Sequence, residues 1–219
     1  MGFLSELPGT LLEQYRVGGP VMHLISVCSV LALTGILYKT YVFRRARTDT
    51  GALIDGVRRA VAAGKIKQAT ELCEQHRGPV AVALKIGLLN SELPEDKIER
   101  HMDSAEIHEL DHLERYLNVL ATISNIAPLI GFFGTVIGMI MSFKILAIKG
   151  MDHPELVAEG ISVALVTTAY GLLVAFVTQP FYNYFVGRVQ ALESQIEIAR
   201  ITLLDALGRC RARVEPAHR

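Results

Sequence analysis

Residues 116–143 read YLNVLATISNIAPLIGFFGTVIGMIMSF, and residues 160–187 read GISVALVTTAYGLLVAFVTQPFYNYFVG. Neither stretch contains a charged side chain. A helix needs about 20 apolar residues to cross the hydrocarbon core of a bilayer. Uncharged runs of this length are rare in soluble cores, so a soluble protein with buried helices is the weaker alternative. The two stretches therefore predict a transmembrane hairpin with a short connecting loop.

A third apolar segment runs from Val17 to Tyr38 and is interrupted only by His23. It is too long for the core of a signal peptide, and no basic cluster precedes it. Basic residues follow this segment and flank the other two on one side, at Arg44, Arg45, Arg47, Arg115 and Arg188. The positive-inside rule then places the N-terminus outside and the C-terminus inside, after three crossings.

The expected division of the chain follows from these crossings. It comprises an external amphipathic segment (1–16), a first transmembrane helix (17–43), a cytoplasmic helical region (44–115), a second transmembrane helix (116–148), a short external loop (149–158), a third transmembrane helix (159–187) and a C-terminal cytoplasmic helix and tail (188–219). Apolar residues make up 51% of the chain and charged residues 20%, with a formal net charge of zero. This balance gives nucleic-acid binding no electrostatic support.

The cytoplasmic region has the periodicity of short amphipathic helices, which we expect at 51–64, 65–77 and 79–89. Pro94, followed by Glu95 and Asp96, opens another helix. We expect that helix to continue into the membrane to near Ile148, with Pro128 as the residue at which it would bend. Residues 188–213 continue the third span as an amphipathic helix. The fold class is therefore an all-α membrane protein, and its long helices with apolar seams predict a homo-oligomeric bundle.

Small and hydroxyl-bearing residues recur at helical spacing on the two central spans. Those expected to serve close helix packing are Pro128, Gly131, Gly134, Gly138 and Gly171. The hydroxyls expected to line a narrow polar passage are those of Thr135, Thr168, Thr167 and Ser142. The alternative is that these stripes are plain helix contacts, with each threonine bonded to a carbonyl of its own helix. Because the mid-membrane stretches carry no acid or base, a partner would have to bring the carboxylate of any proton pathway.

The run APLIGFFGTVIG at 127–138, followed by GIS at 160–162 and TTAYGL at 167–172, closely resembles the MotA/TolQ/ExbB proton-channel family. Length and the three-span layout resemble the ExbB and TolQ branch most. The resemblance implies a stator subunit of the bacterial inner membrane that uses the proton motive force. It also implies a homopentamer around an ExbD- or TolR-like single-span partner that carries a membrane aspartate. Force would pass through a TonB- or TolA-like protein to the outer membrane.

The resemblance also assigns roles to particular residues. Thr135 and Thr168 match the family's pore-facing threonines. Many ExbB-like chains carry a glutamate at the position of Val163, which is missing here. Glu159 lies four residues earlier, and our hypothesis is that it supplies an acidic group at the outer entrance. The alternative is a solvated glutamate next to the loop.

Two other classes of function need to be weighed. His108-Glu109-Leu110-Asp111-His112 matches the H-E-x-x-H motif of zinc proteases. However, no Asp, Glu or His follows Glu114 until Asp152, across the membrane, so a third ligand is not at hand. We therefore expect no metal site and no enzyme, although metal binding across copies stays open. A membrane scaffold without transport is the second alternative. No nucleotide-binding fingerprint is present, and we expect no cofactor.

Overall fold

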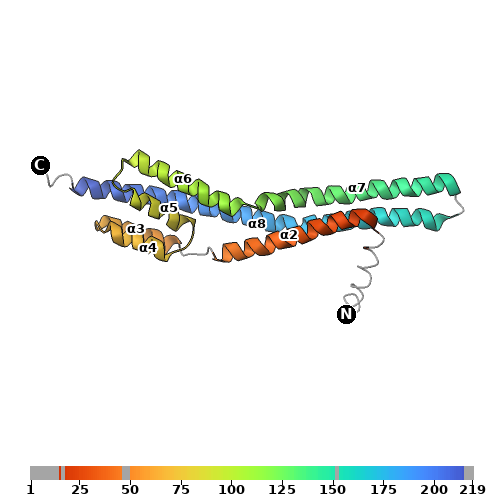
Figure 1. Cartoon of the computed structure of the whole chain (residues 1–219), viewed down its shortest axis with the longest axis horizontal. Helices are drawn as coiled ribbons and strands as arrows, with labels where there is room; N and C mark the ends of the chain where they lie inside the picture. Colours follow the sequence, from red (N-terminus) through yellow and green to blue (C-terminus); the bar gives the residue numbers. More distant parts are fainter. Residues whose placement is uncertain (1–14, 16–17, 46–49, 151–152, 215–219) are drawn as a thin grey trace, which may run out of the picture. The chain divides into compact units, whose positions relative to one another are not determined.

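The computed structural model describes residues 15, 18–45, 50–150 and 153–214, and every regular element in those ranges is an α-helix. The helices are α2 (Gly19–Arg45), α3 (Thr50–Ala62), α4 (Ile66–Gln75), α5 (Pro79–Leu89), α6 (Glu95–Glu114), α7 (Leu117–Lys149) and α8 (Pro154–Val214) (Figure 1). Three helical stretches are long and apolar enough to cross a membrane: Gly19–Arg44, Glu95–Lys149 and Pro154–Ala212. The chain is thus an all-α, multi-pass membrane protein, as the sequence predicted. The expected external segment 1–16 lies almost entirely outside the described residues.

One expectation is wrong. The helix predicted from Pro94 to Ile148 is two helices, because α6 ends at Glu114 and α7 begins at Leu117. Tyr116 adopts a left-handed backbone conformation with φ of 71°, and this conformation interrupts the helical hydrogen-bond ladder. Pro128, in contrast, lies inside α7, which continues through it. The interruption therefore falls at a tyrosine and not at the proline.

The chain divides into two compact units. We call Met1–Tyr38 with Tyr116–Tyr184 the spanning unit, and Lys39–Arg115 with Phe185–Arg219 the bundle unit. Helix α8 contributes to both units without interruption (Figure 1).

The bundle unit has a core of large apolar side chains. The apolar faces predicted for 51–64 and 65–77 are buried there, through Leu53, Val57, Val61, Ala69 and Cys73. The amphipathic end of α8 buries Ile196, Ala199, Leu203 and Leu207 in the same core. Burial raises the pKa of the Cys73 thiol to about 11, as expected for a thiol that fills apolar space. This unit is therefore organised as a water-soluble helical bundle would be.

Charged side chains of the bundle unit pair at the edge of that core. Arg200 on α8 donates to the Asp103 carboxylate on α6, and its Nη1 also lies 3.3 Å from Glu106 Oε2. Burial raises the pKa of Glu106, and Arg200 opposes that rise, while the carboxylates of Asp103, Glu193 and Glu197 add to it. These contacts connect α6 to α8 without a disulfide or metal.

Candidate functional site: the helix pair of the spanning unit

Helices α7 and α8 approach each other through backbone atoms. A Cβ atom built on Gly131 would lie 2.8 Å from Thr167 O, and one on Gly171 would lie 2.6 Å from Ala127 O. A Cβ on Gly138 would lie 2.5 Å from Gly160 O. Such distances leave no room for any side chain, so glycine is required at these positions for this packing. The structure thus places Gly131, Gly134, Gly138 and Gly171 at the contact between α7 and α8, and their role in helix packing stays a prediction.

The hydroxyl of Thr167 lies inside this interface. The side chain is fully buried, and its Oγ1 lies 3.0 Å from both Val163 O and Ala164 O on its own helix. A third acceptor, Gly131 O on α7, lies 3.4 Å away. One hydroxyl has a single proton, so it donates to one of these carbonyls at a time. Thr167 thus fills the space that Gly134 leaves open, where a built Cβ would lie 2.6 Å from Thr167 Cβ.

Thr168 and Ser142 also bond across the helix pair. Thr168 Oγ1 donates to Gly131 O at 3.0 Å, and Ser142 Oγ donates to Val157 O at 2.9 Å. Ser142 is buried, while Thr168 is half-buried. Hydrogen bonds of this kind help to hold helices together in a medium that offers no competing water. Within one copy of the chain, both hydroxyls therefore contribute to the contact between α7 and α8.

Thr135 differs from the other three hydroxyl residues. Its Oγ1 donates to Phe132 O of its own helix at 2.6 Å, and its side chain is half-buried. The residues around it, Phe132, Val136 and Met139, are exposed. Thr135 therefore lies at the margin between the buried glycine stripe and the open face of α7. It is the hydroxyl that a neighbouring subunit or partner helix could reach.

The carboxylate that the sequence singled out lies near the amino end of α8. Glu159 is exposed, and the next residue, Gly160, packs against α7 beside Ser142 Oγ. Val163, one turn further along, is half-buried, and its carbonyl is one of the three acceptors near Thr167. Glu159 is thus not part of the tightly packed stripe.

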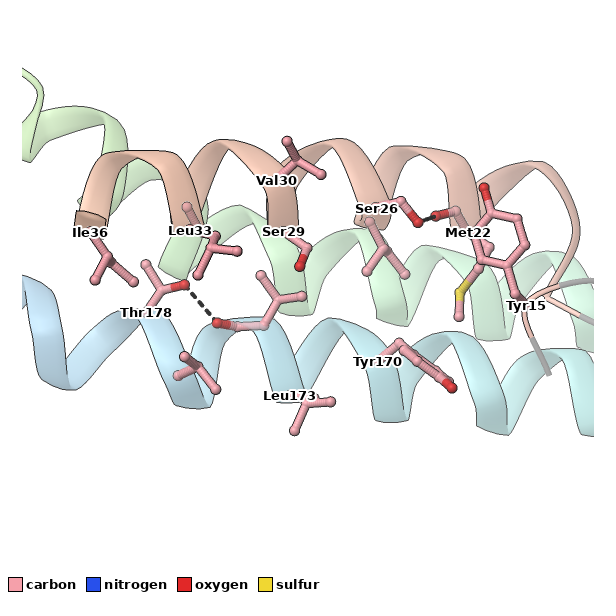
Figure 2. Close-up of a pocket in the computed structure, with 14 residues that line it drawn as sticks. Tyr15, Met22, Ser26, Ser29, Val30, Leu33, Ile36, Tyr170, Leu173 and Thr178 are labelled. Atoms are coloured by element: carbon pink, nitrogen blue, oxygen red, sulfur yellow. Dashed lines mark hydrogen bonds between the residues drawn. The ribbon is translucent and has the colours of Figure 1, made fainter. Parts of the chain in front are cut away.

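An open apolar groove of about 560 Å³ lies between α2 and α8 within the spanning unit (Figure 2). Its lining includes Met22, Ser29, Leu33, Tyr170, Leu173 and Thr178. The hydroxyl of Thr178 donates to Val174 O of its own helix. Ser26, also in the lining, donates in the same way to Met22 O. Among the described residues, the lining of the groove contains no Asp, Glu, Lys, Arg or His.

The H-E-x-x-H segment does not form a metal centre. His108 and His112 are exposed on α6. Among the residues described, no group of three or more His, Cys, Asp or Glu side chains is arranged to hold a metal ion. A catalytic zinc needs three protein ligands at one open site, which an exposed pair on one helix does not supply.

Sequence reasoning overlooked Lys39. It lies near the carboxyl end of α2, within the segment assigned to the first transmembrane helix, and only 1% of it is exposed. Its Nζ donates to Leu113 O on α6 within the bundle unit. The signal that could have drawn attention to it is a lysine directly after an apolar run, five residues before the basic cluster that starts at Arg44.

Comparison with known proteins shows the family to which this chain belongs. Residues 74–198 match the MotA/TolQ/ExbB proton channel family. A protein named as an ExbB homolog of biopolymer transport, from Methanothermobacter thermautotrophicus, is 35% identical over 197 residues, which cover 88% of this chain and 68% of that relative. The biopolymer transport protein ExbB of Aquifex aeolicus is 32% identical over 110 residues, covering 50% of this chain and 73% of the relative.

A Tol-Pal system protein is also similar. The TolQ protein of Haemophilus influenzae is 37% identical over 108 residues, covering 48% of this chain and 47% of the relative. The matches fall on the ExbB and TolQ branch, which the length and three-span layout of the chain resembled most. They also support the expectation that the chain is not an enzyme, since the relatives carry transport-related names. This chain is a member of the MotA/TolQ/ExbB proton channel family, of its ExbB/TolQ-like branch.

Proposed function

We propose that this protein is a stator subunit of an energy-transducing complex in the bacterial inner membrane, driven by the proton motive force. Five copies would surround the membrane helices of an ExbD- or TolR-like partner, with the N-terminus in the periplasm and the C-terminus in the cytoplasm. The partner's membrane aspartate would carry the proton, and a TonB- or TolA-like protein would receive the force. Membership of the family supports this function.

The observation that carries the proposal is the chemistry of the two central spans. Residues 117–143 of α7 and 160–187 of α8 contain no Asp, Glu, Lys, Arg or His. Both helices nevertheless carry threonine hydroxyls close to the glycines at which the two helices pack. A proton cannot cross hydrocarbon without a titratable or hydroxyl-bearing path. These two spans offer only hydroxyls, so on this proposal the titratable group comes from another chain.

The geometry within one copy of the chain favours Thr135 as the main residue that lines the proton path. The hydroxyls of Thr168 and Ser142 bond across the α7–α8 pair, and that of Thr167 is buried within it. The Thr135 hydroxyl bonds only to its own helix and lies beside an open face. We therefore rank Thr135 as a direct lining residue. Thr168 would act at the edge of the path, and Thr167 and Ser142 would fix the spacing of the helices.

The test is proton flux through vesicles that contain the chain together with its single-span partner. Thr135→Ala is expected to abolish flux while the complex still assembles. Thr122→Ala is the matched control, because the Thr122 hydroxyl also bonds its own helix, to Asn118 O, and Thr122 lies nearer the start of α7. Wild-type flux in Thr135→Ala would contradict the pore assignment.

Thr168 needs a different pair of variants, because its hydroxyl also contributes to helix packing. Thr168→Ala removes the bond to Gly131 O, whereas Thr168→Ser keeps a donor at the same place. We expect Thr168→Ser to retain most of the flux and Thr168→Ala to lose it. Equal flux in the two variants would show that the hydroxyl takes no part in transport.

We further propose that the Glu159 carboxylate provides an acidic group at the outer entrance of the path. Its exposure near the amino end of α8 supports this role. Glu159→Gln is then expected to lower the flux at limiting proton concentration. Glu155→Gln is the control, since Glu155 is an exposed acid one turn earlier on the same helix and pairs with His153. Unchanged flux in Glu159→Gln would overturn the assignment.

A scaffold that organises a complex without transport is the second candidate. It is favoured by one observation, namely that two of the four hydroxyls bond across the helix pair and a third, that of Thr167, is buried within it. In a scaffold, Thr135→Ala and Thr168→Ala would both be nearly silent, because a hydroxyl and a methyl group differ little in packing. The flux measurements above therefore separate the two candidates.

A further inference from the structure

The break between α6 and α7 is a defined turn. Arg115 has φ of −49° and ψ of 132°, and Tyr116 has φ of 71° and ψ of −8°. These are the dihedral angles of the two central residues of a type II β-turn, whose second central position normally requires glycine or asparagine. Tyr116 is the one non-glycine residue with positive φ among those described. The turn is therefore formed against the backbone preference of its own residue.

This turn changes the hydrogen bonding at the end of α6. Arg115 N–H still donates to Asp111 O at 2.9 Å. In an uninterrupted helix, Leu113 O would accept a bond from the N–H of Leu117, four residues on. Because the turn replaces that geometry, a carbonyl in the last turn of α6 needs another donor. Lys39 Nζ supplies it, by donating to Leu113 O.

The position of Lys39 is not explained by solvation. A lysine side chain is long enough to reach water from most sites near a helix end. Here the whole residue is 1% exposed, although it carries an ammonium group. One turn further along α2, the buried ring of Phe43 stacks on Phe185 with centroids 5.6 Å apart. The end of α2 is therefore packed into the bundle unit along the face that presents Lys39.

Two electrostatic features offset part of the cost of burying an ammonium at this place. The carboxyl end of a helix carries a partial negative charge, and a cation near it is stabilising. Lys39 lies at the carboxyl end of α6, and the Glu114 carboxylate adds a further attraction. A buried ammonium requires such partners, because burial without them is costly.

We propose that Lys39 is a positioning residue that caps the carboxyl end of α6 and thereby maintains the break at Glu114. The capping bond joins α2 to α6 inside the bundle unit, at residues 74 positions apart in the sequence. Removing the ammonium would favour unwinding of the last turn of α6 or its continuation as a helix, since either restores a donor to Leu113 O. The assignment does not depend on the proposed function, because it concerns the fold of the bundle unit.

The first experiment is amide hydrogen exchange of the full-length protein in lipid nanodiscs, followed in peptides that cover residues 106–116. Lys39→Met is expected to change exchange at the end of α6 by about tenfold or more, the effect of losing a charged hydrogen bond. Lys39→Arg keeps a charged donor and is expected to restore the wild-type pattern. Lys97→Met is the control, because Lys97 is an exposed lysine at the start of the same helix. Wild-type exchange in Lys39→Met would overturn the proposal.

The second experiment uses the wild-type protein and remains decisive if Lys39→Met does not fold. An amine-reactive ester is added to the assembled protein, and the extent of labelling at each lysine is read by mass spectrometry. Lys39 is expected to react at least about tenfold more slowly than Lys97, since its nitrogen is buried and engaged in a hydrogen bond. Equal labelling of the two lysines would show that Lys39 is not held in the bundle unit, and would likewise overturn the proposal.

Discussion

The same helix, α8, builds two different kinds of interface. In the spanning unit it meets α7 through Ala164, Thr167 and Gly171, which face glycine backbones. In the bundle unit it meets α3 to α6 through Ile196, Ala199 and Leu203, which face other large apolar side chains. On α8, most large apolar side chains of the first unit are exposed, whereas those facing the core of the second unit are buried. Phe176, for example, is 78% exposed, whereas Leu203 is 1% exposed.

The difference follows from the solvent of each unit. In water, each buried apolar side chain contributes about 1.5–3 kcal/mol, so large side chains gather inside. In lipid, the acyl chains are as apolar as leucine, and this driving force is absent. Close backbone packing and hydrogen bonds between helices then hold the helices together, and both need small or hydroxyl-bearing residues. One continuous helix can satisfy both media because its residues change at the boundary.

The largest effect should come from emptying the core of the bundle unit. Leu203→Ala is expected to lower the free energy of unfolding by about 2–5 kcal/mol, because it leaves a cavity among buried side chains. Leu172→Ala, at a residue that is 54% exposed on the same helix, is expected to change it by less than about 0.5 kcal/mol. Denaturant titration of the detergent-solubilised protein measures both. A comparable loss at Leu172 would mean that this face packs against protein and not lipid.

Replacing glycine by alanine should change the free energy of unfolding in opposite directions in the two units. Gly138→Ala would place a methyl group 2.5 Å from Gly160 O, and we expect a loss of about 1–3 kcal/mol from overpacking. Gly187, in the bundle unit, has open space around it, and Gly187→Ala is expected to stabilise the helix by about 0.5–1 kcal/mol. The same titration reads both signs. Stabilisation by Gly138→Ala would refute the backbone contact between α7 and α8.

The turn at Tyr116 should reverse the usual order of helix propensity. At this left-handed position, Tyr116→Gly is expected to be about 1 kcal/mol more stable than Tyr116→Ala, because glycine has no Cβ to clash. Both variants lose the edge contact with Tyr38, so that contact cancels in the comparison. Two residues later, on the exposed helical Asn118, the alanine variant should be the more stable by a similar amount. Alanine favoured at both positions would indicate a continuous helix.

The smallest expected effect on stability comes from Glu106, a partly buried carboxyl group in the bundle unit. The pKa of Glu106 is raised, so the folded state binds its proton more tightly than the unfolded chain does. The stabilising contribution of this proton is present below the ordinary glutamate pKa of about 4.3 and is lost as the pH rises through the raised value. Between these two pKa values, the melting temperature of the wild-type protein should therefore fall as the pH rises. The fall should be smaller in Glu106→Gln. A steeper fall in Glu106→Gln would contradict the direction of the shift.

The periodicity of the sequence was sufficient for most of the architecture. Apolar runs without charge predict transmembrane spans directly, because a charged side chain in the hydrocarbon core is costly whatever the fold of the chain. The faces of α3, α4 and the end of α8 followed from spacing, with Leu53, Val57 and Leu203 buried as expected. The motifs around Gly131 and Thr168 also indicated the family before any comparison, through their resemblance to those of known members.

What periodicity could not supply was the partner of each polar group. Spacing placed the four hydroxyl residues on related stripes. Only the packed helices show that Thr168 and Ser142 bond across the pair, that Thr167 is buried within it and that Thr135 lies at its margin. The turn at Tyr116 was also missed, because tyrosine has no local preference for positive φ. Its cost has to be offset by contacts made elsewhere in the fold.

The sequence by itself determined that the chain crosses a membrane and which segments are helical, since these depend on local hydrophobicity and spacing, and its motifs resembled those of the family. Only the tertiary structure decided where the long second helix breaks and that Lys39 is buried against Leu113 O. The physical reason is that a hydrogen bond between residues distant in the sequence depends on how helices pack. Differences of a few tenths of an ångström in packing distance cannot be read from the spacing of residues in the sequence.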